Sequence, residues 1–117
     1  MLVLVALLLA AARPPAAYGE PGHVRLAVSS WCWGTTCGAP IAASGKPVVV
    51  RRGSTISIGF AVVPTSVRVA VSGAPIAVTR RGSTISWPAK RMGGMTVNVK
   101  FRKGFVAYVG RLVVKPG

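Results

Sequence analysis

Acidic side chains are almost absent from this sequence, since Glu20 is its only carboxylate residue and His23 its only histidine. Catalysis by paired carboxylates and sites for divalent metals are therefore excluded, because both need several carboxylates. A Ser-His-Asp arrangement lacks its Asp, and a Cys-His nucleophile would need a free cysteine near His23. Glycine motifs for nucleotides are also missing. The sequence thus predicts a protein that is not an enzyme and holds no metal or cofactor.

The scarcity of acids leaves a large basic surplus: fifteen lysines and arginines give a formal net charge of +14. Without internal carboxylates, these side chains must face water or an external anion, and the positive potential should recruit polyanions. The candidates are an anionic cell-wall polymer or surface glycan, anionic lipid, and nucleic acid. The charges are scattered, with no basic run that would mark a nucleic-acid-binding tail. A solvated surface without a ligand is the alternative interpretation.

The chain opens on an apolar segment, Leu2–Ala12, that has the length of a signal-peptide core and is too short to span a bilayer. Ala17-Tyr18-Gly19 then offers small residues at the third and first positions before a cleavage point, and Ala10-Ala11-Ala12 is a second possible site. A basic segment before the apolar run is missing. We expect a signal peptide over 1–19, a single domain over 20–117 without a transmembrane span, and a secreted or cell-surface location.

Cysteine is scarce as well, because Cys32 and Cys37 are the only two. An even number of cysteines in an apparently exported chain predicts a disulfide. A zinc site would need two further ligands that this chain can hardly supply. We therefore expect Cys32 and Cys37 to be bonded to each other and to fix the shape of a loop, and His23 to be a linker residue.

Helical periodicity is absent, and after about residue 23 apolar side chains alternate with polar ones. This period of two is typical of strands with one buried face. Residues 105–115 are apolar on both faces except at Arg111, so this strand should be central. With 14 glycines and 9 prolines in the chain, many of them in the breaks, we predict an all-β fold, an antiparallel sandwich or small barrel of seven to eight strands. The expected strands cover residues 23–30, 46–51, 54–63, 66–72, 75–79, 83–87, 95–101 and 105–115.

One heptapeptide occurs twice: the sequence RRGSTIS at 51–57 recurs at 80–86. Two copies are too few for a solenoid or propeller. The simpler interpretation is that one turn-then-strand solution was used twice, with Gly in the turn and Ile alternating with Ser and Thr on the strand. In the other interpretation, each Arg pair clamps one anionic group of a repeating ligand.

The tryptophans Trp31 and Trp33 flank the first cysteine, and residues two apart on a strand share a face. If both rings point outward, they make an aromatic platform for a sugar ring or a nucleobase. The alternative is that one or both pack against the disulfide as core.

Antiparallel strands place successive turns at alternate ends of a sandwich, and this assigns each basic turn to an end. Counting from the cysteine loop, Arg80-Arg81 and Arg102-Lys103 share its end, while Arg51-Arg52 and Lys90-Arg91 share the other. We therefore expect the anion-binding residues to be Arg80, Arg81, Arg102 and Lys103, beside Trp31 and Trp33.

Several segments between residues 24 and 115 together resemble small secreted bacterial immunoglobulin-like domains. They are Trp31-Cys32-Trp33 with Cys37, the middle strands, and the stretch from Trp87-Pro88 through Gly94 to Phe101, Gly104 and Tyr108. The resemblance implies an immunoglobulin-like β-sandwich of the kind that serves in adhesion, spacing or recognition at cell surfaces, and it brings no catalytic residues. The cysteines depart from the antibody pattern, because residues five apart in sequence cannot link two sheets.

These features together predict a secreted, basic, non-catalytic binding or structural module of the cell envelope, held to anionic polymers by its charge. The alternatives are a nucleic-acid-binding protein and a cationic membrane-active protein. The apparent signal and the lack of the aromatic pattern of RNA-binding folds disfavour the first, and the lack of an amphipathic helix disfavours the second.

Overall fold

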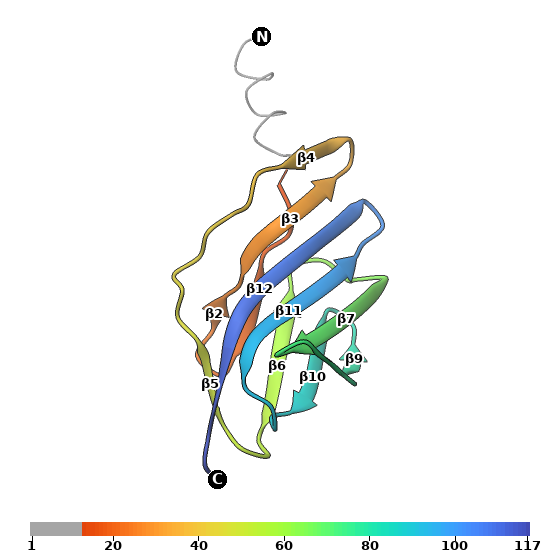
Figure 1. The fold of residues 1–117 in the computed structure, drawn as a ribbon. Coiled ribbons are helices and arrows are strands. Elements are labelled where there is room, and N and C mark those ends of the chain that lie inside the picture. Colours follow the sequence, from red (N-terminus) through yellow and green to blue (C-terminus); the bar gives the residue numbers. More distant parts are fainter. Residues whose placement is uncertain (1–12) are drawn as a thin grey trace.

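The computed structural model describes residues 13–117, and the apolar segment 2–12 lies outside this range. Within the described range, every regular element is a β-strand. The strands form two layers (Figure 1). One sheet has the order β2-β1-β6-β10-β9, and the other has the order β4-β3-β12-β11-β7-β8 with β5 paired to β12. The strands are β1 (Ala17–Glu20), β2 (Val24–Arg25), β3 (Ala27–Trp33), β4 (Thr36–Gly38), β5 (Val48–Arg51), β6 (Thr55–Phe60), β7 (Ser66–Val71), β8 (Ala74–Ile76), β9 (Thr79–Arg81), β10 (Thr84–Pro88), β11 (Gly93–Lys100) and β12 (Gly104–Lys115).

The strand order is that of an immunoglobulin-like β-sandwich. In immunoglobulin lettering, β1-β6-β10-β9 corresponds to the A-B-E-D sheet and β8-β7-β11-β12 to the C′-C-F-G sheet. The hairpin of β3 and β4 extends the second sheet beyond β12, which is therefore an interior strand, as its two apolar faces predicted. Within residues 13–117, the pairings between strands are antiparallel except that of β5 with β12, which is parallel and departs from the expected antiparallel arrangement.

The core consists of the inward faces of both sheets, selected by the alternation visible in the sequence. On β6, the side chains of Ile56, Ile58 and Phe60 are buried while the intervening ones are more exposed. The expected strands after residue 46 are confirmed to within a few residues, although 75–79 contains the short β8 and ends at the start of β9. The structure adds β1 and β4, which have too few residues to show a period. The largest fully buried side chains are those of Tyr108, Ile56, Ile58, Ile85, Met95, Leu112, Val48, Val71, Val97, Val99 and Val106.

The two copies of RRGSTIS lie next to each other, because β6 and β10 are antiparallel neighbours in one sheet. The register sets Ser57 opposite Ser86, and Ile56 and Ile85 are both fully buried. Both turns use a glycine with positive φ, at Gly53 and Gly82. The repeated heptapeptide thus forms the same turn followed by a strand twice in one sheet, as the simpler interpretation of the repeat predicted. Because the two strands run in opposite directions, the two Arg pairs lie at opposite ends of the molecule.

The sandwich begins before residue 20, earlier than the sequence suggested. Strand β1 pairs with β6 from Ala17 to Glu20 and with β2 at Tyr18 and Gly19, and Ala17 is fully buried. The predicted domain boundary at residue 20 therefore falls inside this strand. Cleavage after Gly19 stays a prediction, and such a cut would remove most of this strand.

Candidate functional site

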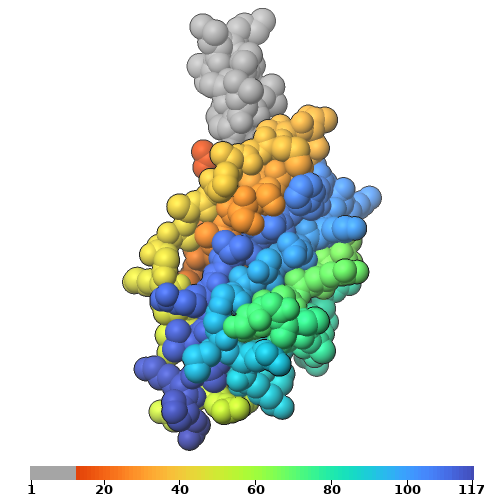
Figure 2. Space-filling model, in the orientation of Figure 1, coloured from red at the N-terminus to blue at the C-terminus, as the bar shows by residue number. Residues whose placement is uncertain are grey.

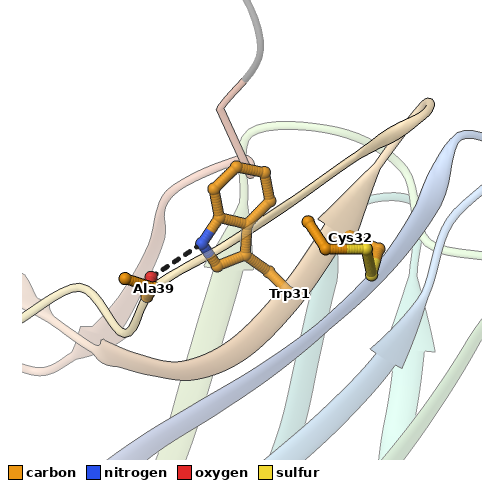
Figure 3. The surroundings of a disulfide bond; sticks show 4 residues. Trp31, Cys32 and Ala39 are labelled. Atoms are coloured by element: carbon orange, nitrogen blue, oxygen red, sulfur yellow. Dashed lines mark hydrogen bonds between the residues drawn. A yellow bond between two sulfur atoms is a disulfide. The ribbon is translucent and has the colours of Figure 1, made fainter.

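The cysteine loop is a β-hairpin with Cys32 and Cys37 directly opposite each other, and the two are bonded as expected, with Cα atoms 4.0 Å apart. Figure 3 shows the indole of Trp31 beside this bridge. Its Nε1 donates a hydrogen bond to the carbonyl of Ala39 at 3.0 Å. The ring lies over Gly38, where it leaves no room for a Cβ atom. Trp31 therefore holds β4 and the residue after it against β3.

The two tryptophans do not form the predicted outward platform. Trp31 is only 8% exposed and belongs to the core cluster. Trp33 packs against this core, and its ring meets the edge of Phe101 at 5.4 Å between centroids. The two rings share a face, as their spacing required, but it is the inner face. The prediction of an aromatic platform at Trp31 is therefore wrong, and Trp33 is partly covered.

The predicted basic residues do lie at the end of the molecule that carries the cysteine loop. The turn holding Arg102 and Lys103 contacts this loop, because the Lys103 carbonyl accepts a hydrogen bond from the amide of Gly34 at 2.7 Å. Arg80 donates from Nη1 to the carbonyl of Pro64 at 2.7 Å, in the loop between β6 and β7. The two pairs lie on different sheets, however: Arg80 and Arg81 are on edge strand β9, whereas Arg102 and Lys103 join β11 to β12.

An exposed aromatic residue with basic neighbours lies instead on the outer face of the second sheet. Phe105 is 45% exposed and is the one aromatic among the large apolar side chains exposed in residues 13–117. Lys100 lies directly opposite it across β11 and β12, and Asn98 lies opposite Arg68 across β11 and β7. These four residues line one groove of about 480 Å³. Figure 2 looks onto this face, where the bands of β3, β12, β11 and β7 lie side by side.

We call the set Arg68, Asn98, Lys100 and Phe105 the sheet-face groove. The sequence predicts the location of only some of these residues. Alternation on 95–101 already placed Asn98 and Lys100 on the outward face of their strand. What alternation does not give is the order of strands, and only that order brings Arg68 of β7 and Phe105 of β12 to either side of β11. The turn with Arg102 and Lys103 adjoins one end of this groove.

The only acidic residue is paired with the only histidine, and neither is in a linker. Nδ1 of His23 lies 2.7 Å from Oε2 of Glu20, and the His23 amide donates to Oε1 at 2.8 Å. The hydrogen bond from the His23 side chain is the main reason why the pKa of Glu20 is lowered. The ring of Tyr18 stacks on His23 at 4.2 Å. This cluster closes the turn between β1 and β2.

The same cluster lines a groove of about 380 Å³ that also includes the hydroxyl residues Ser57 and Thr84. No hydrogen bond within residues 13–117 joins either hydroxyl to His23, so a nucleophile coupled to a base is not assembled there. The described part of the chain contains no group of three potential metal ligands. It also contains no buried charged side chain. Because Glu20 is the only carboxylate residue of the sequence and is paired with His23, no other carboxylate side chain is present to neutralise the fifteen lysines and arginines.

No protein-family model and no curated protein matches the chain. Among solved structures, it is similar to "Chimeric titin Z1Z2 functionalized with a KLER exogenous peptide from decorin", with a TM-score of 0.46 and 20% sequence identity over 61% of this chain and 88% of that chain. Within residues 13–117, no helix is long and apolar enough to cross a membrane. The order of its strands makes the described chain an immunoglobulin-like β-sandwich with a Cys32–Cys37 disulfide.

Proposed function

We propose that the protein is an exported, non-catalytic immunoglobulin-like module that binds an acidic glycan of the cell envelope through the sheet-face groove. The observation that carries this proposal is the register of β7, β11 and β12, which sets an exposed Phe105 beside Lys100 and sets Arg68 on the next row. The apolar segment 2–12 and the disulfide favour export, because disulfides persist in oxidising compartments.

The chemistry of the groove suits a sugar ring that carries a carboxylate or sulfate. A phenyl face offers flat apolar area to the C–H face of the ring. Lys100 lies directly across from it, at a separation of about 5 Å between Cβ atoms for such cross-strand pairs, and can meet the anionic group. Asn98 supplies both a hydrogen-bond donor and an acceptor for hydroxyl groups. Because all four residues stand on paired strands, binding requires little ordering of the backbone.

The charge of the whole molecule supports the same ligand class. A net charge of +14 with a single carboxylate residue produces a positive potential that raises the local concentration of a polyanion. Arg102 and Lys103 in the adjoining turn extend the basic surface along a polymer chain. Arg80 and Arg81 lie at the same end on the other sheet and contribute to the field there, although Arg80 already donates to Pro64.

The test compares variants that lose the same charge at the two ends of the molecule. Heparin serves as the acidic glycan, and affinity is measured by isothermal titration calorimetry. Removal of groove residues in Arg68→Ala/Lys100→Ala should weaken binding by about 30-fold or more beyond the loss in Arg51→Ala/Arg52→Ala, because residues at a binding centre each contribute about 1 kcal/mol or more and two are removed. Equal losses in the two double variants would mean that net charge alone drives binding.

A second comparison separates the glycan from nucleic acid. Phe105→Ala removes the aromatic face without changing charge, and Met92→Ala removes another exposed apolar side chain away from the groove. Heparin binding should fall in the first variant and stay unchanged in the second. Single-stranded DNA of equal charge should bind wild type more weakly than heparin does. Tighter binding of the DNA, with the same dependence on Phe105, would contradict the proposal and favour a nucleic-acid-binding function.

A further inference from the structure

The residues just before the predicted cleavage point are part of the folded core. The carbonyl of Pro15 accepts a hydrogen bond from the hydroxyl of Tyr108 at 2.6 Å, and both residues are buried. The carbonyl of Ala16 accepts from the amide of Ala61 at 3.1 Å, and that of Ala17 from the amide of Leu26 at 2.9 Å. The chain is therefore anchored from Pro15 onward.

The small residues that suggested a cleavage site after Gly19 have a packing reason instead. A Cβ atom at Gly19 would lie 2.6 Å from Cγ2 of Val48, so glycine is required there by the core. Ala17 is fully buried opposite Phe60. Packing in the sandwich therefore accounts for the small residues at positions 17 and 19, and their size is not by itself evidence of a signal-peptidase site.

A cut after Gly19 would also damage the domain it released. Loss of β1 would leave the edge of β6 unpaired and open to association with other chains. The buried hydroxyl of Tyr108 would lose its acceptor, which leaves a desolvated donor without a partner. A cut within 15–19 would therefore remove residues that the folded domain uses for pairing and hydrogen bonding.

We infer that the leader is removed between Ala12 and Arg13, so that the mature chain begins at Arg13; this inference rests on the export part of the proposed function. Ala10 and Ala12 provide the small residues at the third and first positions before the cut. Pro15, the first anchored residue, lies just beyond the new terminus. In the reaction, water adds across the Ala12–Arg13 peptide bond, the C–N bond breaks, and a carboxylate on Ala12 and an amino group on Arg13 are formed by the host signal peptidase.

The experiment expresses the full chain with its own leader in a secreting bacterial host and determines the N-terminus of the exported protein by Edman sequencing and intact mass. The expected N-terminus is Arg13. Ala12→Gln should abolish cleavage, whereas the matched variant Ala11→Gln should be cleaved like wild type, because the position between the two small residues tolerates larger side chains.

Other outcomes overturn the inference in distinguishable ways. An exported chain that begins at Glu20 would show that β1 is dispensable and would refute the site. An intact Met1 on all recovered protein would refute processing and with it the export part of the proposed function. Neither result bears on heparin binding by the purified protein, which tests the binding part separately.

Discussion

Replacement of Tyr108 by Phe tests how firmly the N-terminal segment is held in the fold. The side chain is fully buried, and its hydroxyl makes one hydrogen bond, 2.6 Å long, to the carbonyl of Pro15. Tyr108→Phe keeps the ring and its contact with Phe60, whose centroid is 5.6 Å away, so no cavity larger than one oxygen is made. The free energy of unfolding should fall by about 1–2 kcal/mol in the variant, because the buried carbonyl of Pro15 is left without its hydrogen-bond donor.

The loss can be followed by thermal unfolding monitored by circular dichroism. For a domain of about 100 residues each kcal/mol corresponds to about 4–8 °C, so Tm should fall by roughly 5–15 °C. Burial raises the pKa of Tyr108, so the native state holds its proton more tightly than the unfolded chain. The stability that this supplies is complete below the unfolded pKa of about 10 and is lost as pH rises above it. The Tm gap between wild type and variant should therefore narrow above pH 10. A gap under 1 °C at neutral pH would refute the reasoning.

Two further substitutions test the cysteine hairpin and the turn after β1. Gly38→Ala should destabilise the protein by about 1–3 kcal/mol in chemical denaturation, because the added methyl group overlaps the ring of Trp31; unchanged stability would show that the ring does not lie on Gly38. Glu20→Gln should lower Tm at pH 6, because the bond with His23 lowers the pKa of Glu20. That contribution is present above the unfolded pKa of about 4.3 and is lost as pH falls below it, so the variant and wild type should converge at pH 3, and a gap that persists there would contradict the assignment.

The fold was predictable because apolar and polar side chains alternate in the sequence wherever a strand buries one of its two faces. The run Ile56, Ile58, Phe60 indicates its inner face directly, and the structure buries all three. Strand β1 escaped prediction because four residues show no period and because its Ala and Gly also fit a cleavage motif. The parallel pairing of β5 with β12 is a long-range contact that no local pattern encodes.

The candidate site was predictable to a smaller extent. The rule that residues two apart share a face correctly put Trp31 and Trp33 together, but it cannot say which face is covered. The covering comes from Phe101 and from the close approach of Gly38, both fixed by tertiary contacts. Phe105 was assigned to an apolar strand, and its exposure follows only from its place near the end of β12 on the outer face.

The central claim is that an acidic glycan binds on the outer face of β7, β11 and β12, and amide chemical-shift mapping tests it most directly. A ¹⁵N-labelled sample is titrated with a heparin-derived hexasaccharide at physiological salt, where screening beyond about 8 Å suppresses diffuse attraction. The largest saturable shifts should fall on Arg68, Asn98, Lys100 and Phe105. Larger shifts at the opposite end, around Arg51 and Arg52, or small shifts spread over all basic residues, would contradict the account.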